Sequence, residues 1–101
     1  MEPISVQMFR AGMGHLLDRV CSNKARYIVT RKGVPYVAVA PVPPEADIGA
    51  WEKTQAKVVR NNLAEVFGSV YFENKDLVIM RHKKPMALIT SLRGKHPGFK
   101  N

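Results

Sequence analysis

The sequence predicts an α+β fold in which two tandem βαββ units share one core, as a single-chain pseudo-dimer with its helices packed on an antiparallel sheet. A helix–hairpin pattern occurs twice, at a shift of fifty residues. The chain has 101 residues, so two independent globules would each be too small to bury a stable core. Its apolar fraction of 46% is typical of a globular protein.

The repeat aligns residues 8–42 with residues 58–92 without a gap, and Arg10/Arg60 and Arg31/Arg81 are among the identical pairs. Any two helix–hairpin units obey the same periodicities, but here the register holds without an insertion, which favours duplication. Six apolar positions coincide at the spacing of one buried helix face. They are Met8, Phe9, Met13, Leu16, Leu17 and Val20 in the first unit and Val58, Val59, Leu63, Val66, Phe67 and Val70 in the second.

Each helix is followed by a polar break and then by two β-prone runs around a basic turn, which predicts a hairpin. In the first unit we expect a short strand at residues 4–6, one helix, and hairpin strands at 26–31 and 36–40. In the second unit the corresponding segments are a weaker strand near 53–55, one helix, and strands at 76–81 and 86–90.

These elements divide the chain into a first unit at residues 1–42 and a second at 55–92, which together form one globular domain. Residues 43–54 are proline-rich and acidic, which indicates a linker, with Ile48 and Trp51 as candidate anchors to the core. Residues 93–101 form a basic tail that we expect to be flexible.

The charge is strongly basic. Sixteen Lys and Arg against eight Asp and Glu give +8 and an isoelectric point near 10.0. Residues 51–101 hold ten of the basic and four of the acidic side chains. On so short a chain this indicates a polyanion partner, usually nucleic acid, although solubility, ribosome binding or membrane-surface association would also use such a charge.

The lone cysteine, Cys21, excludes an internal disulfide and is consistent with the reducing cytoplasm. No segment approaches the roughly 20 apolar residues of a membrane span. His15, His82 and His96 lack the paired spacing of a zinc site, and no phosphate-binding glycine loop follows a strand, since Gly12 and Gly14 lie within the expected helix. We therefore expect a cytoplasmic protein that is not an enzyme and has no metal or other cofactor.

The order of short strand, amphipathic helix and hairpin resembles the prevent-host-death (Phd/YefM) antitoxin family. The resemblance covers about three quarters of the chain and is moderately specific, because the motif is short but occurs twice. It is carried in the first unit by Ile4-Ser5-Val6, Phe9-Arg10, Met13, Leu16 to Val20, Tyr27 to Pro35 and Val37 to Ala40, and in the second by Arg60 to Val66 and Val78 to Pro85.

The resemblance implies a two-fold dimer with a continuous core, an N-terminal domain that binds operator DNA, and a C-terminal extension that neutralises a toxin. Three departures stand out. Gln7 and Lys57 occupy the usual position of a helix-capping Ser or Thr. Lys83 replaces Gly33, which predicts a different second turn. No long amphipathic segment follows the second unit, so we expect the toxin-binding part to be missing.

A pseudo-dimer would present equivalent elements to a pseudo-palindromic site, and because the halves differ we expect an asymmetric operator. Arginines early in each helix could reach a phosphate or a guanine edge, whereas basic turns supply phosphate contacts without sequence information. Surface ion pairing and solubility are the plain alternatives. The candidate DNA-binding residues are Gln7, Arg10, Arg31, Lys32, Lys57, Arg60, Asn61, Asn62, Arg81, His82, Lys83 and Lys84, with Arg93, Lys95 and Lys100 as a candidate arm.

The leading hypothesis is therefore a sequence-specific regulator of transcription that binds double-stranded DNA, of the repressor or autorepressor type and of phage or plasmid origin. The alternative is an antitoxin or inhibitor that binds a toxin or host protein through the linker or the tail. RNA or ribosome binding through the basic second half is a third reading. The sequence leaves further oligomerisation open.

Overall fold

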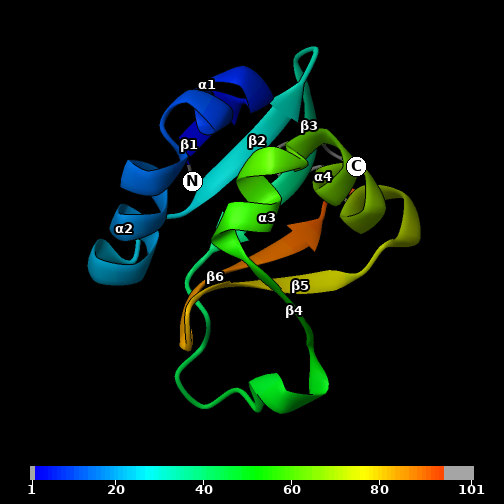
Figure 1. Ribbon diagram of the computed structural model, residues 1–101. Helices are drawn as coiled ribbons and strands as arrows, with labels where there is room; N and C mark the ends of the chain where they lie inside the picture. The colour runs from blue at the N-terminus through cyan, green and yellow to red at the C-terminus, as the bar shows by residue number, and fades with distance from the viewer. Residues whose placement is uncertain (1, 95–101) are drawn as a thin grey trace.

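The computed structural model describes residues 2–94, and within this range four helices cover one face of a six-stranded sheet (Figure 1). The first half of the chain contains β1 (Glu2–Ser5), α1 (Val6–Ala11), α2 (Met13–Asn23), β2 (Tyr27–Arg31) and β3 (Val34–Ala40). A short 3-10 helix, η1 (Ile48–Ala50), follows. The second half contains β4 (Glu52–Gln55), α3 (Ala56–Asn61), α4 (Leu63–Glu73), β5 (Asp76–Arg81) and β6 (Lys84–Ser91).

The strand order is β1-β2-β3-β6-β5-β4, with the antiparallel pair β3–β6 at the centre. Both hairpins are antiparallel, but β1 pairs with β2, and β4 with β5, in parallel. The sheet is therefore mixed, and the expectation of a wholly antiparallel sheet was wrong. The cause is the connection: α1 and α2 carry the chain from β1 back to the start of β2, and such a crossover joins parallel strands.

The two halves have the same elements in the same order. β4, α3 and α4 have the bounds of β1, α1 and α2 advanced by fifty residues. Each hairpin also has a register shift at the same place, between Val29 and Thr30 in the first and between Ile79 and Met80 in the second. The four hairpin strands lie close to their expected positions, and the weakly predicted strand near 53–55 is present as β4.

The single helix expected in each half is in fact two helices. Gly12 ends α1 and begins α2, so it is not inside a helix as expected, and Asn62 divides α3 from α4 in the same way. Each short helix has one buried side chain, Phe9 in α1 and Val59 in α3. Met8 and Val58, expected on the buried face, are 62% and 45% exposed.

The helix starts also differ from expectation. The first helix begins one residue before Gln7, and Ser5 caps it by accepting a hydrogen bond from the Met8 N–H at 3.0 Å. At the equivalent position Gln55 makes no capping bond to α3. Instead, its side-chain amide exchanges two hydrogen bonds with the His82 backbone, at 3.1 and 3.0 Å. Neither Gln7 nor Lys57 is the capping residue.

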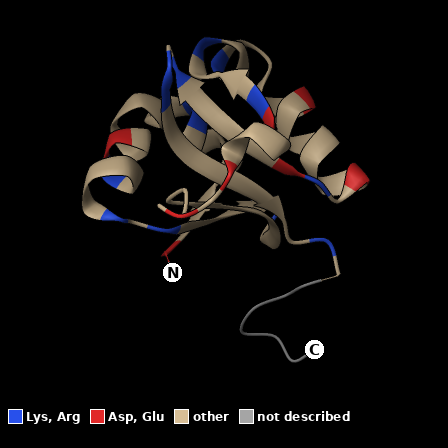
Figure 2. Ribbon diagram, turned by 90° about the horizontal axis from the view of Figure 1, so that it is seen from below, with Lys and Arg blue, Asp and Glu red and all other residues tan. Residues whose placement is uncertain are grey.

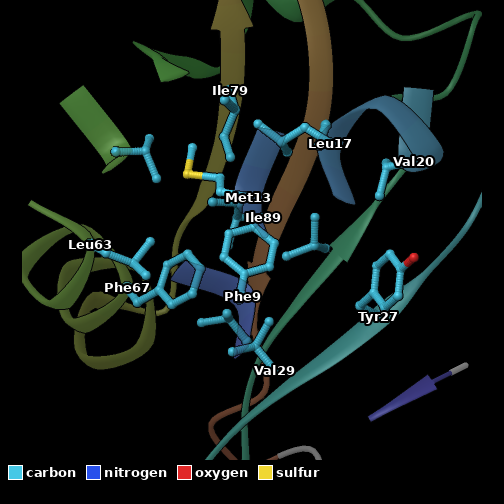
Figure 3. Packing of buried hydrophobic residues seen from close by; sticks show 14 of the residues in the cluster. Phe9, Met13, Leu17, Val20, Tyr27, Val29, Leu63, Phe67, Ile79 and Ile89 are labelled. Carbon is cyan, nitrogen blue, oxygen red and sulfur yellow. The ribbon is translucent and has the colours of Figure 1, made fainter. Parts of the chain in front are cut away.

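One core joins the halves. Phe9 and Phe67 meet at its centre with their ring centroids 5.5 Å apart (Figure 3). The longer helix α2 lies over β6, a strand of the other half, and α4 lies over both β3 and β6. Alternate residues of the sheet complete the same cluster, which includes Tyr27, Val29, Val37, Val39, Leu77, Ile79, Ala87 and Ile89. Cys21 is half-buried against this cluster.

The connection between the halves is shorter than expected, because β4 begins at Glu52, within the range assigned to the linker. Ile48 and Trp51 are half-buried, but neither packs against the core cluster, so they do not anchor the linker to it. Lys95, His96 and Lys100 lie outside the described residues. Among the helices of the described range, none is long and apolar enough to cross a membrane.

Candidate nucleic-acid interface

Arg10 and Arg60 line one cavity of about 340 Å³, which also contacts Asn61, Asn62 and the first turn of α4. Arg60 reaches the start of α2, since a Cβ atom placed at Gly14 would lie 3.7 Å from its Nη2. The structure therefore brings together the two arginines that the repeat makes equivalent, along with both candidate asparagines. Arg10 and Arg60 lie in the last turns of α1 and α3, so the expectation that they lie early in a helix was wrong, because each expected helix is divided in two. Lys57 lies on the same short helix as Arg60, outside this cavity.

A second and larger cavity, of about 650 Å³, lies between the start of α1, the β2–β3 turn and α4. We call it the α1–α4 groove. Three cations line it, and none of its lining residues is acidic. Its walls are partly apolar, and on the α4 side two of the lining residues, Ala64 and Gly68, are small. The lining residues are Ser5, Val6, Gln7, Arg10, Thr30, Arg31, Lys32, Gly33, Tyr36, Ala64, Phe67, Gly68 and Phe72.

The two hairpin turns have different backbones, which confirms the prediction from the Gly33 to Lys83 difference. Lys32 and Gly33 both have positive φ, 53° and 79°, as in the two-residue turns that match strand twist. In the second turn only His82, with φ 56°, is in the left-handed region. The two hydrogen bonds that the Gln55 side-chain amide exchanges with the His82 backbone hold His82 in this conformation. The two turns would therefore offer their cations to a ligand in different geometries.

The equivalent arginines Arg31 and Arg81 have different partners. Arg81 Nη1 donates to Asp18 Oδ1 at 2.8 Å, in an ion pair that joins β5 to α2. Arg31 pairs with no carboxylate of the described residues, and its guanidinium lies over the Tyr36 ring, 5.6 Å from the centroid. Within residues 2–94 the remaining candidate cations also form no ion pair; they are Arg10, Lys32, Lys57, Arg60, Lys83 and Lys84.

Figure 2 shows several Lys and Arg residues close to one another at the upper end of the view, on a helix and at the tip of a hairpin.

Of the candidate arm, Arg93 is described, and its guanidinium donates to the Phe72 carbonyl at 2.6 Å. That contact holds Arg93 against the end of α4, so Arg93 is not part of a free arm.

Sequence reasoning missed Asp18, Gly68 and Tyr36. The signal for the first two was present, because Asp18 and Gly68 are aligned by the repeat and differ in charge. The pairing of Asp18 with Arg81 spans 63 positions, however, and no local pattern indicates it. In the sequence Tyr36 has the pattern of an ordinary strand residue, and only the folded hairpin brings Arg31 over its ring.

Within the described residues, no group of three or more His, Cys, Asp and Glu side chains could hold a metal ion. Comparisons with family models, with curated proteins and with solved structures give no significant match to this chain.

Proposed function

We propose that this protein is a sequence-specific DNA-binding regulator, built from two Phd/YefM-like units that fold as a pseudo-dimer in one chain. The observation that carries the proposal is the placement of Arg10 and Arg60. They are equivalent under the repeat, occupy the same position in their short helices and line one cavity. Neither has a carboxylate partner among the described residues.

The pairing of the central strands supports the pseudo-dimer. Ala38 pairs with Thr90 and Ala40 pairs with Leu88, and the shift of fifty converts one pair into the other. This exchange is the one that a pseudo-two-fold axis through the centre of the sheet would produce, as between the subunits of a symmetric dimer. DNA-binding dimers use this symmetry to place equivalent elements on two half-sites.

The chemistry of the surface is suited to a duplex. An arginine can bond a guanine edge or a phosphate through two parallel N–H groups, and amides such as those of Asn61 and Asn62 can pair with adenine. The turn cations Lys32, Lys83 and Lys84 would contact phosphates, which supply affinity and salt dependence but no sequence information. This division of roles predicts that binding has both a specific and a salt-sensitive component.

An antitoxin or inhibitor is the second candidate, and one observation favours it. Phe72 is 59% exposed beside the basic α1–α4 groove. An exposed aromatic side chain next to cations is suited to an acidic segment of a partner protein. Purification of the chain together with its genomic neighbours distinguishes the two readings, because only the second requires a stoichiometric protein partner.

The test is a mobility-shift assay with DNA from upstream of the protein's own reading frame, at several salt concentrations and with unrelated competitor DNA. We expect competitor-resistant binding that an Arg10→Ala/Arg60→Ala variant loses, because each bidentate arginine contributes about 1–3 kcal/mol. The matched control is Arg19→Ala/Arg26→Ala, which removes the same charge at two exposed residues that line neither cavity.

Loss of binding in the first variant but not in the control supports specific readout. Equal losses in both, or weak binding that is the same for all sequences and disappears in modest salt, would leave only non-specific attraction between charges. In that case the protein partner becomes the leading hypothesis.

A further inference from the structure

The two halves differ at one pair of equivalent positions that decides whether a cation is neutralised. Asp18 on α2 binds Arg81 of the second hairpin at 2.8 Å. Its equivalent on α4 is Gly68, which faces the first hairpin, since a Cβ atom at Gly68 would lie 3.5 Å from the Tyr36 hydroxyl. The groove beside the first hairpin is therefore open, whereas a carboxylate occupies the equivalent place beside the second hairpin.

The ion pair of the second half shows what an arginine at this position binds. Arg81 takes one oxygen of a carboxylate anion, and a phosphate presents similar oxygens at similar distances. In the first half Arg31 occupies the same position on the hairpin, and Lys32 and Arg10 line the same groove. An incoming anion there would meet three cations and no competing carboxylate of the groove lining.

The first-half groove is also held in shape. The aromatic ring of Tyr36 supports the Arg31 guanidinium. Two lining hydroxyl groups already have hydrogen-bond partners. Ser5 accepts from the Met8 N–H at 3.0 Å, and Thr30 donates to the Ile4 carbonyl at 3.3 Å. The left-handed backbone of Lys32 and Gly33 sets the direction of the turn. A groove whose cations are already positioned loses less entropy when an anion binds.

We propose that the α1–α4 groove is a binding site for a phosphate-type oxyanion, open in the first half because of Gly68 and closed in the second by Asp18. Its occupant is a phosphate of the DNA backbone, and this assignment of the occupant rests on the proposed function. The first half then holds DNA more strongly than the second, so the operator has one dominant half-site.

The repeat itself supplies the test variants. Gly68→Asp gives α4 the carboxylate that α2 has at Asp18, and this carboxylate should form an ion pair with Arg31. Ser22→Asp is its control, because it adds the same negative charge at an exposed residue of α2 that lines neither cavity. Asp18→Ala releases Arg81 and should open the second half. It also keeps the test possible if Gly68→Asp fails to fold.

The anion site is measured without DNA, by ¹H–¹⁵N NMR titration with inorganic pyrophosphate. We expect the amide signals of Arg31, Lys32 and Gly33 to shift in the wild type and in Ser22→Asp, with at least a fivefold weaker response in Gly68→Asp. We expect Asp18→Ala to add shifts at Arg81 and His82. Equal titration in all variants, or no shift at the first turn of the wild type, overturns the proposal.

The DNA arm measures affinity against salt concentration. Each phosphate contact contributes about one unit to the slope of log K against log salt. Gly68→Asp should lower this slope by about one and Asp18→Ala should raise it, while Ser22→Asp leaves it unchanged. If pyrophosphate binds in the groove but no DNA binds, the anion site stands and the proposed function fails. If DNA binds while Gly68→Asp and Asp18→Ala match the wild type, the function stands and the inference fails.

Discussion

Val39 pairs with Ile89 at the centre of the sheet, and these two residues are related to each other by the shift of fifty that relates the two halves. This pair therefore converts into itself under the repeat, as it would if the axis of the proposed pseudo-dimer passed beside it. Both side chains are fully buried in the common core. Such an axis would relate α1 to α3 and would account for the one cavity that Arg10 and Arg60 both line.

Because Phe9 of the first half and Phe67 of the second are in contact in the core, we expect the halves to unfold together. Phe9→Ala and Phe67→Ala should each lower the free energy of unfolding by about 3–5 kcal/mol, from lost burial and the cavity left behind. Since the rings are in contact, the loss in the double variant should differ from the sum of the two single losses. Urea unfolding followed by circular dichroism and by Trp51 fluorescence measures this.

The control for these core variants is Phe72→Ala, at an aromatic residue that is 59% exposed. We expect it to change the free energy of unfolding by less than about 1 kcal/mol. Separate transitions for the two spectroscopic probes would contradict a single shared core.

The Tyr27 hydroxyl is buried and has no hydrogen-bond partner among the described residues, whereas its equivalent in the second half is the apolar Leu77. A buried unsatisfied polar group costs about 1–3 kcal/mol. Tyr27→Phe should therefore raise the free energy of unfolding by about 1 kcal/mol. The control is Tyr71→Phe, at a half-buried tyrosine whose hydroxyl is not among the buried, unpaired polar atoms of the described residues. A destabilised Tyr27→Phe variant would show that the hydroxyl is satisfied in solution.

Much of the fold could be predicted because the repeat supplies each element twice. The strand at 76–81 has the bounds predicted for it, since a run of four consecutive apolar residues and the turn that follows both mark it. The break at Gly12 could not be seen from periodicity, because the hydrogen bonds from the Gly12 and Leu16 N–H groups continue helical bonding around it. The parallel edges depend on how the crossover returns, which is a property of the whole sheet.

The sequence could indicate which residues of the candidate site are equivalent, but not their contacts. The repeat aligns Arg10 with Arg60, and both line one cavity in the structure. The basic turn suggests that Arg81 is free for a ligand, but Asp18 of the other half forms an ion pair with it. Only the packing of α2 against the second half creates that contact, so neither segment alone could indicate it.

The two hairpin turns should respond differently to alanine. Gly33 has a φ of 79°, where a side chain is strained although the space around it is open. Gly33→Ala should therefore lower the free energy of unfolding by about 1–2 kcal/mol. Lys83→Ala, at the equivalent position without positive φ, should change it by less than about 0.5 kcal/mol. Thermal unfolding of the two variants measures the difference, and equal losses would mean that the turns share one conformation.

Lys75 supplies a pH dependence whose sign can be stated. Its ammonium donates to both Glu52 oxygens, at 3.0 and 3.2 Å, and lies 3.5 Å from Glu73, so the pKa of Lys75 is raised above 10.5, chiefly by the hydrogen bond to Glu52. A raised pKa means that the folded state holds the proton more tightly, so the stabilisation is complete below pH 10.5 and is lost as the pH rises through the folded-state value.

A double-mutant cycle of Lys75→Ala and Glu52→Gln isolates this pair from other groups that titrate in alkali. Because the Glu52 side chain is 56% exposed, the coupling energy near neutral pH should be no more than about 1 kcal/mol. It should stay constant up to about pH 10 and then fall towards zero, because neutral lysine no longer pairs with the carboxylate. Urea unfolding of the four proteins from pH 7 to pH 12 measures the coupling. A coupling that grows with pH would contradict the raised pKa, and one that is zero throughout would show that the contact is too well solvated to hold β4 against the start of β5.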